Sequence, residues 1–327
     1  MKRISVYVPQ QAVIEAITPA YRLFKSANDF LLAMGKKPLF EVEYVGLQKN
    51  IRANDGEYLV KTNRLLEEVK RTDLVILPAL YGDMGEAVKA NERAIPWIRA
   101  MHRKGAEVAS LCVGAFLLGA TGLVDRKKCS THWAYADAFR KQYPEVEVVA
   151  SSVITQEGRV YSSGGANLLW NLLLYLLEKL ADRRIAVLAA KYFAIDIDQD
   201  SQGAFTIFSG QKDHHDREVL RAQELIEKSC ADRITIGRLA DQVNVSRRSL
   251  ERRFKNVTNH TVIEYLQRVR IEAAKRDFET SHKNVAEVMY EVGYADTKAF
   301  RDIFKRITGL TPLEYRNKYG RRYDYLN

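Results

Sequence analysis

SRRSLERRFKNVT, at residues 246–258, is the stretch that decides the fold of the second half of this chain. It contains four arginines and one lysine, and its two large apolar residues, Leu250 and Phe254, are spaced by one helical turn. This pattern is typical of a solvated charged helix, and also of a helix whose basic face binds a polyanion. Taken alone, the stretch leaves both interpretations open.

The same pattern recurs fifty residues later, as DTKAFRDIFKRIT at residues 296–308. The second copy keeps the N-cap, the apolar pair and the basic edge of the first. The matching pairs are Ser246 with Asp296, Leu250 with Phe300, Phe254 with Phe304, Lys255 with Lys305, and Thr258 with Thr308. Because solvation gives no reason for these features to recur in register, the repeat favours two helices that bind an anion.

A short helix and a tight turn precede each copy, in ITIGRLADQVNV at 234–245 and in VAEVMYEVGYA at 285–295. A short helix, a turn and a capped basic helix make up the helix-turn-helix motif, whose second helix enters the major groove of DNA. We expect the long helix at 261–280 to hold the two motifs apart, so that they contact successive major grooves.

Two groups of side chains on the second helices are candidate DNA contacts. Residues near the N-terminus of each helix reach base edges, and arginine is the commonest reader of guanine. This group comprises Arg247, Arg248, Ser249 and Arg252 of the first copy, and Thr297, Lys298 and Arg301 of the second. Another group fits phosphate contacts, which position a protein without specifying sequence. Its members are Arg253, Lys255, Lys305 and Arg306.

The charge of the chain is consistent with a polyanionic partner. From Ser246 to the C-terminus there are 18 Lys+Arg and 11 Asp+Glu, so this quarter carries +7 of the formal net charge of +10. A hydrophobic fraction of 46% over 327 residues is enough for two cores and argues against disorder. We therefore expect two folded domains, with most of the excess positive charge in the second.

The three cysteines, Cys112, Cys129 and Cys230, lack paired motif spacing. We therefore expect neither a disulfide framework nor a metal site, and no cofactor. The N-terminal MKRISVYVPQ is typical of a first strand and not of a signal peptide. The most apolar run, at 168–177, is too short to span a bilayer. These features predict a soluble, cytoplasmic protein.

The first part of the chain alternates strand and helix signals, which is typical of a parallel sheet with helices on both faces. The expected strands are 3–9, 40–47, 73–80, 106–112 and 146–151, and the expected helices are 61–70, 86–103, 133–142 and a pair within 166–194. Beyond a polar segment without helical periodicity, every periodic segment is helical. We expect an α/β domain at 1–195, a linker at 196–216 and an all-α domain at 217–327.

One segment of the α/β domain, ASLCVGAFLLGATGLVDRKKCSTHW at 109–133, suggests a reactive site. A strand ends at Cys112 and a turn of small residues begins a helix, as in a nucleophile elbow, and the helix N-terminus would lower the pKa of the thiol. With His132 and Glu15, this cysteine would make a nucleophilic site.

The alternative is a buried structural cysteine, and the neighbouring residues favour it. Val113 follows the cysteine at the position where hydrolases of this shape often have histidine. In PALYGD, Leu80 and Tyr81 direct side chains towards the region where an oxyanion hole would need free backbone N–H groups. We therefore expect a non-catalytic domain.

Residues 218–320 resemble an AraC-type DNA-binding domain over essentially the whole length of that domain. The first motif of the family is matched by RLADQVNVSRRSLERRFKNVT, and the second half by VAEVMYEVGYADTKAFRDIFKRITGLTPLEYR. One departure is Asn244, where the family usually has glycine, and asparagine tolerates the same left-handed backbone.

Residues 1–195 resemble the PfpI-like, class I glutamine-amidotransferase-like fold, a flavodoxin-like parallel-sheet sandwich. The whole chain resembles a GlxA-family transcriptional regulator, through LCVGAFLLGATGLVDRKKCSTHW at 111–133 and ITPAYRLFKSAND at 17–29. The resemblance implies that the front domain senses a small molecule and dimerises without catalysing a reaction. The sequence departs from the family pattern at PALYGD and at Asn171, where an acidic residue is common.

The resemblance also implies a class of ligand, because characterised members respond to nitrogenous metabolites. We expect the carboxylate of Glu15 to meet a cationic group, with Tyr81 or Trp133 stacked on it, and the helix N-terminus after Cys112 to take a carboxylate. The candidate pocket residues are Glu15, Tyr81, Cys112, Val113, His132 and Trp133.

These inferences predict a dimeric, ligand-responsive transcription factor, an activator rather than a repressor. Its expected partners are promoter DNA, a small-molecule effector, a second copy of the chain bound through the N-terminal domain, and RNA polymerase. One alternative is a cysteine-dependent hydrolase or glyoxalase-like enzyme with a DNA-binding tail. Another is a non-specific nucleic-acid-binding protein, which would show steep salt dependence without sequence preference.

Overall fold

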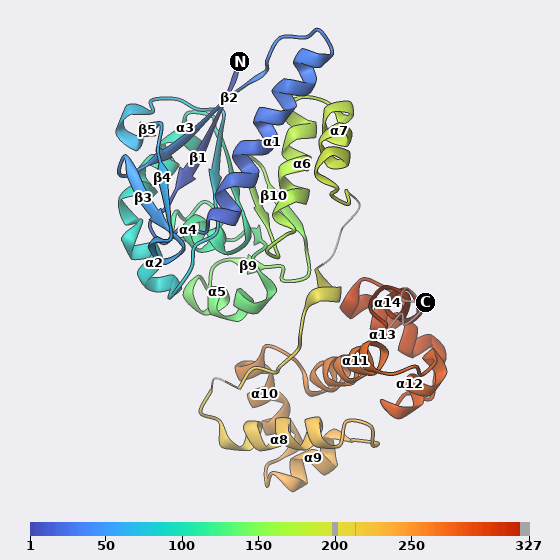
Figure 1. Cartoon of the computed structure of the whole chain (residues 1–327). Coiled ribbons are helices and arrows are strands. Elements are labelled where there is room, and N and C mark those ends of the chain that lie inside the picture. Colours follow the sequence, from blue (N-terminus) through green and yellow to red (C-terminus); the bar gives the residue numbers. More distant parts are fainter. Residues whose placement is uncertain (198–201, 213, 321–327) are drawn as a thin grey trace. The chain divides into compact units, whose positions relative to one another are not determined.

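A computed structural model describes residues 1–197, 202–212 and 214–320 of the chain. The chain divides into two compact units, one of Met1–Gln202 and one from Gly203 to the C-terminus (Figure 1). The boundary falls within the polar segment 196–216, where we expected a linker. Each unit packs its own buried apolar residues, so each is described by itself.

In the described part of the first unit, seven strands form one sheet in the order β10-β11-β7-β6-β1-β2-β5. Neighbouring strands are parallel, except that β10 pairs with β11 in the antiparallel direction. The strands are β1 (Lys2–Val8), β2 (Phe40–Gly46), β5 (Arg64–Leu65), β6 (Leu74–Leu77), β7 (Glu107–Ser110), β10 (Ile154–Glu157) and β11 (Val160–Ser163). Successive side chains point to opposite faces, and all four residues of β6 are buried, so both faces are covered. The expected fold class is confirmed.

Helices on both sides of the sheet provide this cover. In Figure 1, α1, α6 and α7 lie side by side, and they contact one another. Three helices contact strands of the sheet: α1 contacts β1 and β2, α3 contacts β7, and α4 contacts β6. The helices are α1 (Ile14–Ala33), α2 (Met84–Ala90), α3 (Ile95–Arg103), α4 (Ala115–Ala120), α5 (Ala136–Gln142), α6 (Leu169–Leu180) and α7 (Arg183–Phe193). Among the helices of the described residues, none is both long enough and apolar enough to cross a bilayer.

Some expectations for this unit are wrong. The segment 61–70, expected as a helix, contains the end of strand β4 (Tyr58–Lys61) and then strand β5. The strand expected at 146–151 is reduced to β9 (Glu147–Val148), which pairs with β8 (Lys128–Cys129) outside the main sheet. The sequence pattern also missed β10 and β11, which extend the main sheet. β5, β9 and β11 pair with β2, β8 and β7, which lie farther away in the sequence, and β10 pairs with the neighbouring β11. Local periodicity does not reveal such pairing.

The helix expected at 86–103 is interrupted at Asn91, which lies between α2 and α3. The side chain of Asn91 is fully buried and accepts hydrogen bonds from the hydroxyl of Tyr7 at 2.7 Å and from the backbone N–H of Gln10 at 2.8 Å. It also donates to the carbonyl of Gln10 at 2.9 Å. These bonds fix the loop that follows β1 at the carboxyl edge of the sheet.

The described part of the second unit is helical. Its helices are α8 (Arg217–Lys228), α9 (Ile236–Gln242), α10 (Arg247–Thr258), α11 (Val262–Thr280), α12 (Val285–Glu291), α13 (Thr297–Thr308) and α14 (Pro312–Tyr319). Two apolar clusters hold them together, one around α8, α9 and α10 and the other around α12, α13 and α14. The long helix α11 contributes to both, with Tyr265 in the first cluster and Phe278 in the second.

The caps expected from the repeat are present. The hydroxyl of Ser246 accepts a hydrogen bond from the N–H of Ser249 at 3.3 Å, and the carboxylate of Asp296 accepts one from the N–H of Ala299 at 2.7 Å. The apolar pair of each helix is buried, with exposures of at most 1%, in Leu250 and Phe254 of α10 and in Phe300 and Phe304 of α13. The repeat in the sequence is therefore a repeat in the structure.

Candidate nucleic-acid interface and ligand site

The turns before α10 and α13 have related backbone conformations, because each contains one residue with left-handed φ. The left-handed residue is Asn244, with φ of 56°, in the first turn and Gly293, with φ of 82°, in the second. Ser246 follows Asn244 by two positions, whereas Asp296 follows Gly293 by three, so the second turn is one residue longer. Asn244 therefore supplies the left-handed backbone that glycine supplies in the other copy.

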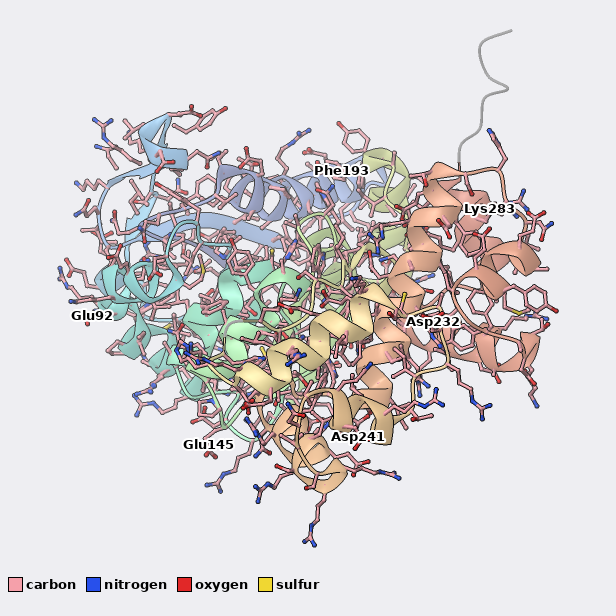
Figure 2. The ribbon with its side chains drawn as sticks, turned by 90° about the horizontal axis from the view of Figure 1, so that it is seen from below. Glu92, Glu145, Phe193, Asp232, Asp241 and Lys283 are labelled. Atoms are coloured by element: carbon pink, nitrogen blue, oxygen red, sulfur yellow. The ribbon has the colours of Figure 1, made fainter. Side chains whose placement is uncertain are left out.

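The basic edges of α10 and α13 face solvent. The exposed candidate contacts are Arg247, Arg248, Arg252 and Lys255 of α10, and Thr297, Lys298, Arg301, Lys305 and Arg306 of α13. Ser249 and Arg253 are half-buried. In Figure 2, nitrogen-tipped side chains project outward near the labelled Asp241, at the end of α9. Most of the candidate DNA contacts are therefore accessible to a ligand.

Four of these side chains keep all their hydrogen-bond donors available. Within the described residues, no hydrogen bond or ion pair is made by the side chains of Arg248, Arg252, Lys298 and Arg301. By contrast, Arg247 pairs with Glu251 on its own helix at 3.2 Å, and Arg306 donates to the side chain of Gln267 at 2.7 Å. An unpaired guanidinium presents five donors in a fixed fork, which suits a guanine edge or a phosphate.

Arg253 is engaged inside the protein, which differs from the phosphate contact expected from the sequence. Its guanidinium donates to the carboxylate of Asp216 at 2.7 and 2.6 Å, and to that of Glu218 at 2.5 Å. Asp216 is also the N-cap of α8, where it accepts a hydrogen bond from the N–H of Val219. Arg253 lies on the side of α10 that contacts α8, so it holds α10 in place instead of facing solvent.

We expect Asp216→Asn to lower the free energy of unfolding by about 1 kcal/mol at pH 7, because asparagine keeps the N-cap but loses the ion pair with the half-buried Arg253. The Arg253 guanidinium lowers the pKa of Asp216 below its ordinary value of 3.8. A lowered pKa gives stability that is present above pH 3.8 and is lost as the pH falls through the folded-state value. Urea unfolding at pH 7 should separate the variant from wild type, and the difference should shrink at a pH below 3.8. An equal difference at both pH values would contradict this assignment.

Cys112 occupies an elbow between β7 and α4, as expected from the sequence. Its φ of 55° lies in the left-handed region, which a residue with a side chain seldom adopts. At Gly114, a β-carbon would overlap the carbonyl oxygens of Leu77 and Pro78 at the end of β6. The missing side chain at Gly114 therefore lets the elbow pack closely against the carboxyl end of β6.

The thiol of Cys112 is not activated, which corrects the expectation that the helix N-terminus lowers its pKa. Burial raises the pKa of Cys112 to about 11, and only a hydrogen bond with the backbone of Val113 acts in the opposite direction. Both residues are nearly inaccessible, with exposures of 6% and 5%. The loss of hydration of the thiolate outweighs the favourable position at the start of a short helix.

Loops at the carboxyl edge of the sheet bring Glu15 and Tyr81 together through a residue that sequence reasoning missed. The side-chain amide of Asn54 donates to both carboxylate oxygens of Glu15, at 3.2 and 3.1 Å. The next residue, Asp55, donates its backbone N–H to the hydroxyl of Tyr81 at 2.9 Å. Asn54 also accepts from the N–H of Ile14, so it caps α1 from another loop. The turn triplet Asn-Asp-Gly at 54–56 was the available signal.

This edge also contains the point where the strand order reverses. From β1 the chain passes to β2 on one side, and later to β6, β7 and β11 on the other. Glu15 follows β1, and Tyr81 follows β6. In open α/β sheets, ligands bind outside the carboxyl ends of the strands at such a switch point. The arrangement therefore suits a small-molecule site that includes Glu15 and Tyr81.

His132 and Trp133 belong to a second group, which lies beside Cys112. The hydroxyl of Thr131 donates to the carbonyl of Cys112 at 3.3 Å, and the rings of His132 and Trp133 are 5.3 Å apart between centroids. Burial lowers the pKa of His132, whose Nδ1 accepts a hydrogen bond from the N–H of Ala134 at 3.2 Å. The imidazole is therefore held neutral. Across the described residues, no hydrogen bond or ring contact joins this group to Glu15 or Tyr81.

We expect iodoacetamide at pH 8 to label Cys230 and to leave Cys112 and Cys129 unmodified in the folded protein. Cys230 is partly exposed, whereas the other two thiols are buried and each has its pKa raised to about 11. Only the thiolate reacts at an appreciable rate. Mass spectrometry of tryptic peptides checks the order of labelling, with urea-unfolded protein as the control in which all three react. Fastest labelling at Cys112 would contradict the assignment and favour a nucleophilic cysteine.

The sequence matches two known protein families, one in each unit. A model of the DJ-1/PfpI family matches residues 2–179, which is more than half of the chain. The chain belongs to the DJ-1/PfpI family. A model described as a helix-turn-helix domain matches residues 239–318 of this DJ-1/PfpI protein. The second match covers both of the motifs that the repeat predicted.

Curated relatives of this DJ-1/PfpI protein combine the same two domains. The HTH-type transcriptional regulator ArgR of Pseudomonas aeruginosa is 24% identical over 222 residues, which are 68% of this chain and 67% of the relative. The HTH-type transcriptional regulator GlxA of Rhizobium meliloti is 24% identical over 226 residues, which are 68% of this chain and 69% of the relative. The chain thus spans about two thirds of the length of each relative. The resemblance to a GlxA-family, AraC-type regulator is confirmed.

A solved structure supports the fold of the first unit. The crystal structure of a putative transcriptional regulator protein from Vibrio parahaemolyticus aligns with a TM-score of 0.52 and 21% identity. The alignment covers 58% of this chain and 98% of that one. At this level of identity the likeness concerns the fold alone and does not extend to the chemistry of this DJ-1/PfpI unit.

Proposed function

We propose that the protein is a sequence-specific DNA-binding transcriptional regulator whose α/β unit binds a small metabolite without catalysis. The observation that carries this proposal is the pair α10 and α13. Each helix buries an apolar pair and turns a basic edge to solvent, where Arg248 and Lys298 have no partner among the described residues. Phosphate contacts supply affinity and base contacts supply specificity, so a helix of this kind can provide both.

The proposed role of the first unit is to bind an effector and not to turn over a substrate. The buried thiol of Cys112, with its raised pKa, argues against nucleophilic catalysis. The exposed carboxylate of Glu15, at the switch point of the sheet, suits a cationic group, and Tyr81 supplies an aromatic neighbour. These features support a nitrogenous metabolite as effector, with Cys112, Val113, His132 and Trp133 as further candidates for the pocket wall.

The proposal extends to the assembly. The domains 1–195 and 217–327 would act as sensor and DNA-binding domain in a homodimer formed through the first unit. Bound at a promoter in the cytoplasm, the dimer would activate transcription through contact with RNA polymerase. The names of the relatives support regulation of transcription.

Selection of DNA from a random duplex pool by the full chain tests the DNA-binding role. We expect an enriched motif with two half-sites whose spacing is roughly one helical turn. Equal retention of all sequences, with steep loss of binding as salt rises, would replace the proposal with non-specific binding.

A thermal-shift screen of amino acids and quaternary amines tests the sensor role. A binding effector raises the melting temperature of the full chain, by an amount that grows with the logarithm of its concentration once that exceeds Kd. An ester or glyoxal substrate that is turned over by wild type but not by Cys112→Ala would instead make the first unit an enzyme.

A further inference from the structure

The residues that follow the boundary between the units lie along the DNA-binding unit and are part of it. We name Gly203–Gly210 the strap. Ala204 belongs to the apolar cluster of the second helix-turn-helix motif, and Phe208 packs against the cluster of the first. The ring of Phe208 lies 5.0 Å from that of Tyr265. The strap therefore contacts both motifs, although it lies in the polar segment 196–216 that we expected to be a linker.

The middle of the strap is held by a buried ion pair on α11. The ammonium of Lys275 and the carboxylate of Glu272 are 3.0 Å apart, and their side chains are only 4% and 14% exposed. Lys275 also donates to the carbonyl of Thr206, and Glu272 accepts from the N–H of Phe208 at 3.2 Å. A buried charge is costly unless its hydrogen bonds are satisfied, so the backbone of the strap completes the environment of this pair.

The far end of the strap is fitted against the core. Gly210 has a φ of 73°, and a β-carbon at this position would overlap the hydroxyl of Tyr265. That hydroxyl donates to the carboxylate of Glu227 at 2.7 Å and accepts from the side chain of Gln223 at 3.2 Å. Tyr265 is fully buried and cannot yield without disturbing these bonds. Gly210 therefore fixes the register of the strap on the first motif.

The residue before the strap is bound just as closely by the first unit. Gln202 is fully buried, and its side-chain amide donates to the carbonyls of Thr131 at 3.0 Å and Ala150 at 2.6 Å. Its backbone N–H donates to the carbonyl of Ser151 at 3.0 Å. Thr131 in turn donates to the carbonyl of Cys112. Gln202 is therefore held by the loop that carries the His132 group of the candidate ligand site.

We propose that Gln202 and the strap couple the sensor to the DNA-binding unit, an inference that rests on the proposed function. A single residue, Gly203, lies between the anchor in the first unit and Ala204 in the second. A displacement of the 131 or 150 loops therefore acts on the strap through the backbone. The strap braces the two motifs along α11, so its position alters how firmly α10 and α13 are held relative to each other. We call this coupling the relay; its two anchors are Gln202 in the first unit and the strap in the second. Because coupling between two binding sites is reciprocal, DNA binding affects the sensor as effector binding affects the DNA-binding unit.

Gly210→Ala in the full chain tests the brace, by which we mean the contact of the strap with both motifs along α11. The added methyl group displaces the strap from Tyr265, and the two motifs then bind DNA more independently. We expect affinity for a selected two-half-site duplex to fall by about tenfold or more, because part of the avidity of the linked motifs is lost. Affinity for a duplex with one half-site scrambled should stay within about twofold of wild type. Gly35→Ala in the first unit is the matched control, because Gly35 has a similar φ of 71° but open space where the β-carbon would lie.

The outcomes of this experiment separate the two proposals. If wild type selects no motif, the proposed function fails, and the brace falls with it. If wild type binds the two-half-site duplex and Gly210→Ala binds it equally well, the brace alone is wrong. Circular dichroism of both variants checks the helix content, and a loss of helix restricted to Gly210→Ala moves the test to Phe208→Ala, which removes the ring that packs against Tyr265.

Hydrogen exchange tests the relay to the sensor. In wild type, we expect the selected duplex to slow amide exchange in the loops around Thr131 and Ser151, because coupling between two sites is reciprocal. Gln202→Ala, and an insertion of Gly-Ser-Gly-Ser after Gln202, should abolish this change while DNA binding persists. Unchanged exchange in wild type on DNA binding would overturn the relay. An equal change in wild type and both variants would also overturn it.

Discussion

Phe304→Ala is expected to lower the free energy of unfolding of the second unit by about 3–5 kcal/mol. The ring of Phe304 is fully buried and packs against Phe278, Phe300 and Tyr315, with centroid separations of 5.8, 5.7 and 5.4 Å. Its removal leaves a cavity where α11, α13 and α14 meet. Domains are stable by only about 5–15 kcal/mol, so the variant should lose much of the stability of the second motif.

The positions of the tryptophans allow this effect to be assigned to one unit. Trp97, Trp133 and Trp170 all lie in the first unit, so tryptophan fluorescence reports on that unit, and helical circular dichroism also reports on the second. We expect the urea midpoint of the second unit to fall, while the fluorescence midpoint stays unchanged. Tyr290→Ala removes an aromatic side chain that is 65% exposed, and it should change stability by no more than about 0.5 kcal/mol. A fluorescence midpoint that shifts with Phe304→Ala would contradict independent unfolding of the units.

The second unit was largely predictable because the interactions that define its helices and turns join residues close together in the sequence. Helix capping, one-turn spacing of apolar residues and left-handed turn residues act within a few positions of each other. They placed Ser246 and Asp296 as caps and Gly293 in a tight turn, and the structure agrees at each position. The left-handed backbone at Asn244 was implied by the resemblance to the AraC-type domain. Repetition strengthened these predictions, since two independent copies satisfied the same rules.

The first unit was predictable in class but not in detail. Buried apolar strands such as β6 are recognisable from composition, whereas β5 has only two residues and depends on its pairing with β2. The charged residues around β5 imitate helical periodicity, so the segment 61–70 was assigned wrongly. Short strands have little sequence signal of their own, because their neighbours in the sheet stabilise them.

Side-chain partners that are distant in sequence account for the remaining differences. The ion pair of Arg253 with Asp216 spans 37 positions, so the charge on α10 gave no indication that this arginine points inward. Asn54 approaches Glu15 only after the sheet has formed. The raised pKa of Cys112 results from burial by the whole unit. The sequence motif predicts a helix N-terminus but gives no information about burial.

Arg248→Ala is expected to weaken binding to the selected two-half-site duplex by about 1–3 kcal/mol, roughly 5- to 150-fold, and to relax base preference at one position. Arg248 lies in the first turn of α10, is exposed, and has no partner among the described residues, so its full guanidinium fork is available to a guanine. Fluorescence anisotropy with duplexes that vary one base at a time measures both effects.

Lys305→Ala separates base reading from charge attraction. Lys305 lies in the last turn of α13, away from the N-terminal residues that reach bases, so its loss should weaken all duplexes about equally and reduce the salt slope by about one. Arg126→Ala removes a comparable positive charge from the first unit, where the side chain is 87% exposed, and should leave both quantities unchanged. If Arg248→Ala weakened all duplexes equally, α10 would contribute charge alone, and sequence preference would have to come from α13 or from the shape of the DNA.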